Sequence, residues 1–232
     1  MIISHQHKFI FLKPQKTAGT SVELLLSRIC GSQDVITPLG FDPDPKVRQK
    51  HQAKDPQNYR RPKPFKHWQL NELFWYFTKG RKPHLNYWEH LTAAKVWTYA
   101  GEDIWDAYQK ISIVRNPWDH AVSMYKWMTH YNFEKSTNFD LETFIVRVYK
   151  EMWCFYSIKN RYQIDFMIKF EELEASLKEL AQTLPLDTSS IPVTKTNTRS
   201  RNEHYQSFYN AKTRDMIYEI NKPIVERFSY EF

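Results

Sequence analysis

Residues 8–29 read Lys-Phe-Ile-Phe-Leu-Lys-Pro-Gln-Lys-Thr-Ala-Gly-Thr-Ser-Val-Glu-Leu-Leu-Leu-Ser-Arg-Ile. Residues 8–12 form a short run rich in aromatic and branched apolar side chains, which is typical of a buried strand. Residues 13–19 contain Pro and Gly and predict a turn-like loop. Residues 20–29 place apolar side chains at helical spacing. The order of strand, loop and helix predicts the start of a β–α unit.

The same order recurs further along the chain. Residues 110–114 (Lys-Ile-Ser-Ile-Val) predict a second strand. Asn116 and Pro117 are favourable as the N-cap and the first residue of the helix behind it. Residues 164–170 predict a third strand, which a helical pattern at 171–183 follows. Strands that alternate with helices predict a parallel sheet covered by helices.

Length and composition are those of an ordinary globular domain. The chain has 232 residues, with 41% hydrophobic and 25% charged residues, which excludes wholesale disorder. Its two cysteines, Cys30 and Cys154, exclude a disulfide scaffold and a multi-cysteine zinc site. We expect one domain over residues 1–232 with an α/β fold, namely a P-loop-like three-layer fold with a central parallel sheet flanked by helices.

Membrane and targeting signals are not found in the sequence. No apolar run is long enough to cross a membrane, and the N-terminus lacks the apolar centre and small-residue cleavage site of a signal peptide. Two thiols fit a reducing compartment. We therefore expect a cytoplasmic protein without a membrane anchor.

The excess of positive charge is concentrated in one segment. Lys and Arg number 33 against 26 Asp and Glu, and residues 46–66 hold eight of the basic residues and a single acid, Asp55. Six of the 12 prolines lie from Pro38 to Pro64, so we expect a basic, Pro-rich insertion at about 38–67 in the form of a long loop. Such charge favours an anionic ligand. The segment is interpreted as a lid, as a surface that captures an anionic acceptor, or as a solvated loop.

The loop after the first predicted strand has the features of an anion site. Backbone N–H groups and the helix dipole attract an anion to the start of a helix, small residues let it approach, and hydroxyl and ammonium groups add donors. The residues expected here are Lys16, Thr17, Ala18, Gly19, Thr20 and Ser21. The alternative is an ordinary strand–helix turn with a solvated lysine.

This loop differs from the usual loop that binds nucleoside triphosphates. That pattern has two glycines with Lys-Ser/Thr after the second, whereas Lys16 precedes Gly19. Enzymes with that pattern also use an acidic residue to organise Mg²⁺, and the second predicted strand is followed by Arg115 instead. We expect no metal site.

A second anion site is predicted after the second strand. Arg115 leaves the strand end, and Ser123 lies two turns into the next helix. A guanidinium and a hydroxyl can share one phosphate, since the guanidinium offers two parallel donors. The alternative is that Arg115 only pairs with Asp119. Two such sites at neighbouring strand ends predict a ligand that is anionic at both ends, such as a nucleotide phosphorylated at two places.

These two segments resemble the motifs of the sulfotransferases that use 3′-phosphoadenosine-5′-phosphosulfate (PAPS), in particular the carbohydrate and bacterial members. The family's 5′-phosphosulfate loop, Pro-Lys-Thr-x-Gly-Thr-Ser, is similar to residues 14–21, and its 3′-phosphate motif, Arg-Asn-Pro-x-x-Arg-x-x-Ser, is similar to residues 115–123. The segments beginning at His90 and Lys169 and the ending at 227–232 also resemble these members. The likeness spans most of the chain except 38–67.

The chain departs from the family pattern at two positions. Gln15 is an extra residue between Pro14 and Lys16, and His120 stands where the family often has Arg. The position of His120 is expected to brace the first loop.

The resemblance implies a function for individual residues. Lys16 is expected to neutralise charge on the leaving phosphate oxygen, and His90 to take the proton of the acceptor hydroxyl. Glu89 and His84 are the alternative bases, and His90 could instead only cap a helix. Residues expected to bind PAPS are Lys16, Thr17, Ala18, Gly19, Thr20, Ser21, Arg115, Ser123, Arg199 and Arg201.

The resemblance also implies the partners. The acceptor is expected to be a hydroxyl compound, first of all a glycan, and glycans that are already anionic are among the expected acceptors. Two other functions remain open: a nucleotide-dependent phosphotransferase that uses the first loop, and a basic nucleic-acid-binding protein that uses residues 46–66. No known nucleic-acid recognition motif accompanies that segment, so we expect no nucleic-acid partner.

Overall fold

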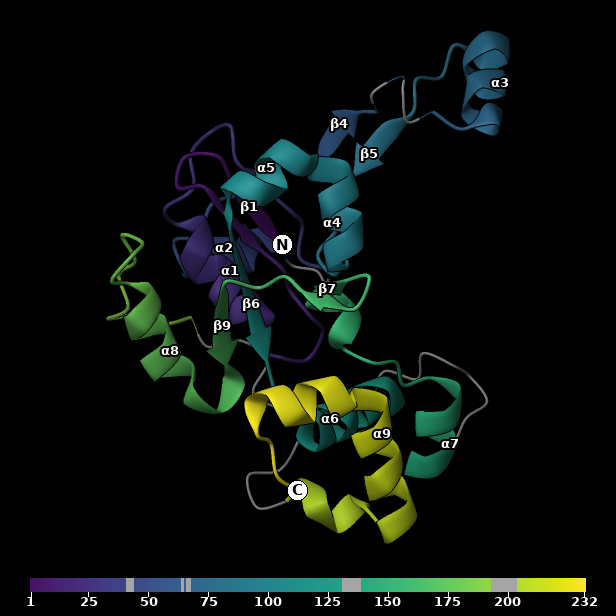
Figure 1. Ribbon diagram of the computed structural model, residues 1–232. Helices are drawn as coiled ribbons and strands as arrows, with labels where there is room; N and C mark the ends of the chain where they lie inside the picture. Colours follow the sequence, from purple (N-terminus) through teal and green to yellow (C-terminus); the bar gives the residue numbers. More distant parts are fainter. Residues whose placement is uncertain (41–43, 64, 66–67, 131–138, 193–203) are drawn as a thin grey trace.

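The structure is a computed structural model, and it describes residues 1–40, 44–63, 65, 68–130, 139–192 and 204–232. A central five-stranded sheet has the order β3–β1–β2–β6–β9. Its strands are β1 (Ile2–Ser4), β2 (Phe9–Phe11), β3 (Val35–Ile36), β6 (Gln109–Val114) and β9 (Phe166–Lys169). The three strands predicted from apolar runs, β2, β6 and β9, are confirmed and lie side by side (Figure 1).

The sheet is mostly parallel. β2, β6 and β9 are paired in parallel, with Phe11 opposite Ile111 and Ile113 opposite Ile168. β1 is antiparallel to both of its neighbours, β2 and β3. Four of the five strands therefore run in one direction. The predicted parallel arrangement is confirmed for the three predicted strands, whereas β1, where the sequence predicts no strand, is antiparallel because a short turn after Ser4 returns the chain directly into β2.

Alternate side chains of each strand face opposite layers of helices, as the two-residue period of a strand requires. Phe9 and Phe11 belong to one buried cluster, which contains apolar residues of α1 (Gly19–Ser27) and α8 (Leu173–Leu180). Ile10 and Leu12 belong to another, with residues of α4 (Ala93–Ala100) and α5 (Glu102–Ala107). The three-layer α/β architecture is thus confirmed.

A third buried cluster lies within a group of helices beyond the carboxyl ends of the parallel strands (Figure 1). The helices are α6 (Pro117–His130), α7 (Leu141–Arg147) and α9 (Ala211–Phe228). The predicted break near Pro223 is confirmed, since Asn221 has non-helical dihedral angles and Pro cannot donate to the preceding turn. The remaining short elements in this half are η2 (Trp153–Phe155), β7 (Ser157–Ile158), β8 (Arg161–Tyr162), η3 (Phe170–Glu172) and η4 (Tyr205–Phe208).

The segment expected to be a long loop is in part regular structure. It contains α2 (Asp44–Lys50) and β4 (Arg60–Pro62), and β4 pairs with β5 (His84–Asn86). Arg48 in α2 is fully buried. The Pro-rich composition led us to expect a loop here. In addition, α2 is fixed by one buried guanidinium rather than by an apolar face, so it has no helical pattern of apolar residues that the sequence could reveal. Beyond the β4–β5 hairpin, α3 (Leu70–Lys79) stands away from the body of the protein (Figure 1).

Candidate active site

The two predicted anion sites lie at adjacent strand ends. β2 runs into the loop 12–18 and then into α1, and β6 runs into Arg115 and α6. Because β2 and β6 are paired in parallel, both loops emerge at the same edge of the sheet. Ligands of open α/β sheets bind at the carboxyl ends of the strands. The structure therefore brings together the two motifs, which are about a hundred residues apart in the chain.

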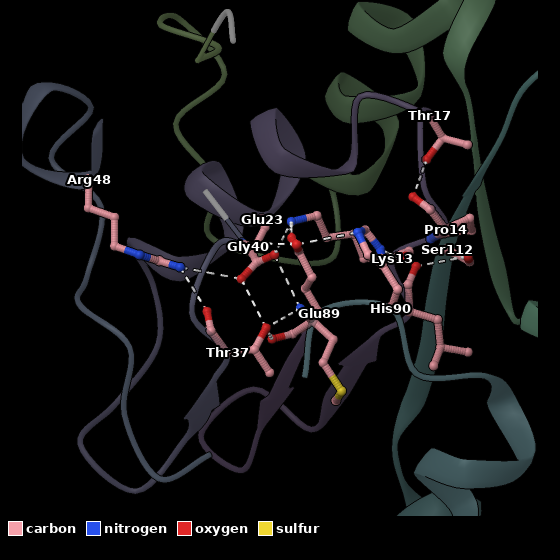
Figure 2. Close-up of polar contacts among 12 residues, drawn as sticks. Lys13, Pro14, Thr17, Glu23, Thr37, Gly40, Arg48, Glu89, His90 and Ser112 are labelled. Atoms are coloured by element: carbon pink, nitrogen blue, oxygen red, sulfur yellow. Dashed lines mark hydrogen bonds and ion pairs between the residues drawn. The ribbon is translucent and has the colours of Figure 1, made fainter. Parts of the chain in front are cut away.

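Five consecutive carbonyl groups at the start of the first loop accept hydrogen bonds from side chains. The pairs are Ser112 Oγ to Leu12 O (2.9 Å), His90 Nδ1 to Lys13 O (2.8 Å), Thr17 Oγ1 to Pro14 O (3.0 Å), His120 Nε2 to Gln15 O (2.9 Å) and Arg115 Nη1 to Lys16 O (2.8 Å). Figure 2 shows the contacts of His90 with Lys13 and of Thr17 with Pro14. Each peptide plane from 12 to 16 is therefore fixed on its carbonyl side by a side chain, four of them from elsewhere in the chain.

The loop then turns into α1 through two strained residues. Lys16 and Ala18 have positive φ values of 56° and 61°, a conformation that costs a non-glycine residue free energy and clusters at functional sites. Left-handed residues in a turn can direct successive N–H groups into one concavity that binds anions. At the start of α1, Gly19 and Thr20 precede the first hydrogen bonds of the helix, which the N–H groups of Ser21 and Val22 donate to the carbonyl of Ala18. Fixed carbonyls and a helix start together make this loop suited to an anion.

A second reason favours glycine at position 19, in addition to the predicted close approach of an anion to the loop. A Cβ atom at this position would lie 2.6 Å from Cγ of Lys13. Glycine therefore lets the buried Lys13 side chain cross the start of α1. Thr17 and Ser21, two other residues expected at the ligand, are buried.

Lys16 is half-buried at the mouth of the loop. Its ammonium lies 5.7 Å from the centre of the Trp127 ring of α6, within the range of a cation–π contact. An aromatic face on one side limits where the ammonium can lie.

Arg115 connects the two motifs. Its Nε donates to Asp119 Oδ2 at 2.8 Å, and its Nη2 lies 2.7 Å from the same oxygen. Its Nη1 donates to the carbonyl of Lys16, and its guanidinium lies 4.2 Å from the centre of the Phe170 ring. The pair with Asp119 that the sequence left as an alternative is thus present. A phosphate bound here would compete with Asp119 for the guanidinium.

The start of α6 is held by groups that the sequence did not single out. Asn116 N–H donates to Glu171 Oε1 at 2.6 Å, and the Asn116 side chain caps the helix by accepting from the N–H of Trp118 at 3.0 Å. Tyr230 donates to the other oxygen of Glu171 at 3.0 Å. Asp119 and Ser123 lie at i and i+4 in α6 and are therefore neighbours on one side of the helix, and Arg115, which precedes the helix, is paired with Asp119. The C-terminal segment therefore packs against the predicted 3′-phosphate site.

His120 is buried and neutral. Burial and the nearby Arg115 charge lower its pKa to about 3. Because the carbonyl of Gln15 can only accept, Nε2 carries the proton, and Nδ1 accepts from the hydroxyl of Tyr149 at 3.0 Å. Asn221, at the kink of α9, in turn lies 3.5 Å from that hydroxyl. His120 thus braces the first loop against the helical half.

His90 lies behind the start of the loop. Its Nδ1 donates to the carbonyl of Lys13, so Nε2 is the nitrogen that can accept a proton. That Nε2 lies 3.4 Å from Glu89 Oε1, and the His90 side chain is 15% exposed. A carboxylate at this distance stabilises an imidazolium. Glu89 itself is buried, and although burial acts to raise its pKa, the neighbouring His90 and the Lys13 charge hold that pKa well below its usual value.

A buried ion cluster supports both the loop and His90 (Figure 2). Lys13 Nζ lies 2.9 Å from Glu23 Oε2 and 2.5 Å from Glu89 Oε2. Arg48 Nη2 lies 3.4 Å from Glu23 Oε1 and donates to the carbonyl of Thr37 at 2.9 Å. The Met1 amino group also lies 3.1 Å from Glu23. The cluster joins the first loop, α1, α2 and the segment that carries His90.

Several predicted residues are not part of this assembly. Arg199 and Arg201 lie outside the described residues, so their role stays a prediction. His84 is exposed on β5. Within the described residues, no group of three or more His, Cys, Asp or Glu side chains is placed to hold a metal ion, and the predicted absence of a metal stays a prediction. The described helices include none with the length and apolar character needed to cross a membrane.

Comparison with known proteins gives limited information. No protein-family model matches the chain, and no curated protein matches it. One solved structure that resembles it is the crystal structure of a sulfotransferase from Alicyclobacillus acidocaldarius, with 14% sequence identity and a TM-score of 0.41. The match covers 97% of this chain and 94% of that chain. A similarity this distant does not define a function, which has to be argued from the site.

Proposed function

We propose that the protein is a sulfotransferase that moves a sulfuryl group from PAPS to a hydroxyl of an acceptor. One observation carries this proposal: a loop with five side-chain-bound carbonyls lies beside Arg115 at the same sheet edge, in the places where the two PAPS motifs would lie. The donor would present its 5′-phosphosulfate to residues 16–21 and its 3′-phosphate to Arg115 and Ser123.

The chemistry follows from the groups around the loop. The acceptor oxygen attacks sulfur, the bond from sulfur to the 5′-phosphate oxygen breaks, and adenosine 3′,5′-bisphosphate leaves as a sulfate ester forms. Lys16 stabilises the negative charge that develops on the leaving oxygen, as an already oriented cation does most effectively. His90 Nε2 takes the hydroxyl proton, and the nearby Glu89 carboxylate stabilises the imidazolium that results.

The ligand preference separates this proposal from the two other functions. Full-length protein is heated with adenosine 3′,5′-bisphosphate, with ATP and Mg²⁺, or with a single-stranded oligonucleotide. We expect stabilisation by the bisphosphate alone, of about 2.7 kcal/mol when its concentration is a hundred times its Kd. Stabilisation by ATP and Mg²⁺ instead would indicate a phosphotransferase, and stabilisation by the oligonucleotide alone would indicate a nucleic-acid-binding protein.

Two variants test the role of the second motif in the same assay. Arg115→Lys keeps a positive charge but cannot contact Asp119, the Lys16 carbonyl and a phosphate together, so we expect at least about tenfold weaker binding of the bisphosphate. Lys178→Ala, on the exposed side of α8, is the matched control. Turnover is then measured as sulfate transfer from PAPS to a panel of hydroxyl acceptors that includes neutral and anionic glycans. A glycan acceptor is part of the proposal, and transfer only to small phenols contradicts that part.

A further inference from the structure

The helix α3 exposes an apolar stripe. Leu70, Phe74 and Phe77, at i, i+4 and i+7, are 86%, 61% and 79% exposed. This spacing places them on one side of the helix. No residue of α3 is buried. An apolar stripe on a well-capped helix that stands away from the body indicates a surface for a partner.

The opposite side of α3 holds the helix on the β4–β5 hairpin. Trp68, just before the helix, donates from Nε1 to the carbonyl of Lys63 at 2.8 Å, and its ring lies 5.1 Å from that of Tyr76. Glu72 lies 2.7 Å from the Lys63 ammonium. We call β4, α3 and β5 together the arm. Because the inner side is fixed by these contacts, the stripe is presented outward.

The segment 60–86, which contains the arm and the residues that connect its elements, carries most of the net charge of the protein. Residues 60–86 contain seven basic residues and one acidic residue, Glu72, whereas the whole chain has a net charge of +7. Arg60, Arg81 and Lys82 are exposed. The Lys79 ammonium lies 4.4 Å from the centre of the Trp75 ring. Apolar and basic side chains therefore occur together on one projecting element.

We propose that the arm binds the surface of an anionic phospholipid bilayer. Helices with bulky apolar residues on one side and basic residues around them lie in the interface, with the apolar side among the acyl chains and the cations at the phosphates. The stripe itself offers no hydrogen-bonding group, as recognition of a sugar chain would need. Two arms packed on each other would bring their positive charges together, which disfavours a second copy as the partner.

Vesicle binding tests the proposal without any turnover assay. Full-length protein is sedimented with vesicles of phosphatidylcholine alone and of phosphatidylcholine mixed with phosphatidylglycerol, at low and high salt. We expect binding to the mixed vesicles, and at least about tenfold weaker partitioning to phosphatidylcholine alone or at high salt.

Two double variants, each with a control, separate the apolar and the electrostatic contributions to vesicle binding. Phe74→Ser with Phe77→Ser should weaken partitioning at least about tenfold, whereas Val146→Ser, exposed on α7, is the control. Arg81→Glu with Lys82→Glu should weaken it by a similar factor. Arg161→Glu with Lys178→Glu, at exposed positions outside the arm, controls for net charge.

The remaining outcomes overturn the proposal. Equal binding to both kinds of vesicle, or equal losses in the control variants, shows that the arm does not recognise an anionic bilayer. Binding to a sulfated polysaccharide without binding to vesicles assigns the arm to a glycan. Dimerisation that Phe74→Ser with Phe77→Ser abolishes, without vesicle binding, assigns it to a second copy.

Discussion

Nε2 of His120 donates a hydrogen bond across 2.9 Å to the carbonyl oxygen of Gln15. These are the two positions at which the chain departs from the motifs that it resembles: Gln15 is an extra residue in the first loop, and His120 replaces a residue that is often Arg. In the structure, the two residues that differ from the motifs, Gln15 and His120, are therefore in direct contact. A neutral imidazole supplies the donor for the additional carbonyl without adding a second buried cation beside Arg115.

Replacing His120 should destabilise the protein, and the loss should be larger when the new side chain can form neither of its two hydrogen bonds. His120→Phe leaves Gln15 O and the Tyr149 hydroxyl without their partner, and we expect the free energy of unfolding to fall by about 2–4 kcal/mol. His120→Gln keeps an N–H donor, so we expect a smaller loss of about 1 kcal/mol. Denaturant unfolding at pH 7 measures both. Equal stability of His120→Phe and the wild type would exclude a bracing role.

The same residue should make stability depend on pH. The pKa of His120 is lowered from 6.5 to about 3 by burial and by the charge of Arg115, so between these values the unfolded chain binds more protons than the folded protein. The contribution of His120 to the free energy of unfolding should therefore be fully present above pH 6.5 and should decrease as the pH drops toward 3. In this range His120 adds up to about 1.4 kcal/mol per pH unit to the slope of the free energy of unfolding. His120→Gln should flatten the slope, and a slope as steep as that of the wild type would contradict this contribution.

Lys16 should affect turnover more than binding. Its ammonium is held near Trp127 at the mouth of the loop, where the proposed mechanism develops charge on the leaving oxygen. We expect Lys16→Ala to lower kcat by about 10²- to 10³-fold, with a much smaller change in the Kd for adenosine 3′,5′-bisphosphate. Sulfate transfer from PAPS and calorimetric binding measure the two quantities, with Lys178→Ala as the control. A loss in Kd as large as that in kcat would make Lys16 a binding residue only.

The strands that carry the site could be predicted because their signals are local. β2, β6 and β9 are apolar runs followed by loop and helix patterns, and Asn116 with Pro117 marks the start of α6. β1 and β3 were missed because each contains only two apolar residues, whereas β2 lies in a run of four apolar residues, 9–12, that is long enough to be recognised. α2 was missed because the burial of Arg48 depends on Glu23, which lies 25 residues earlier.

Most of the contacts that fix the loop could not be predicted from the sequence. Ser112, His90, His120 and Arg115 each donate to a loop carbonyl that is between 77 and 105 residues away in the chain. The resemblance led us to expect that the position of His120 braces the loop. Nothing in the local sequence around Ser112, His90 or Arg115 indicates their contacts, since each donor reaches the loop only once the sheet has formed. Glu171 and Tyr230 were overlooked as site residues for the same reason. The resemblance to the two motifs predicted which residue types occur and in which order. The hydrogen-bond partners of the loop can be recognised only in the tertiary structure.

Gly19→Ala tests the close approach of Lys13 to α1. The added Cβ would lie 2.6 Å from Lys13 Cγ, and Lys13 cannot easily move because Glu23 and Glu89 hold its ammonium. Overpacking of this kind costs about 1–3 kcal/mol, against a gain of at most about 1 kcal/mol from helix propensity. We expect a net loss of stability in thermal unfolding. A variant as stable as the wild type would show that Lys13 moves aside freely.

Glu23→Gln tests the buried ion cluster. The substitution removes the charge that faces Lys13 and Arg48, both of which are buried, and breaking such a pair costs about 3–5 kcal/mol. We expect a loss near the lower value, because Lys13 keeps Glu89, and Arg48 keeps the carbonyls of Thr37 and Lys54. The exposed Glu219→Gln is the control in the same denaturant titration.

The pH dependence of this variant provides a second measurement. Burial acts to raise the pKa of Glu23, but Lys13 and the other neighbouring cations outweigh it and hold that pKa below the ordinary value of 4.5. The stabilisation is therefore present above pH 4.5 and is lost as the pH falls below it. Glu23→Gln should lose less stability than the wild type on acidification through this range. A parallel slope in the two proteins, together with a small loss at pH 7, would show that the cluster contributes packing rather than charge pairing.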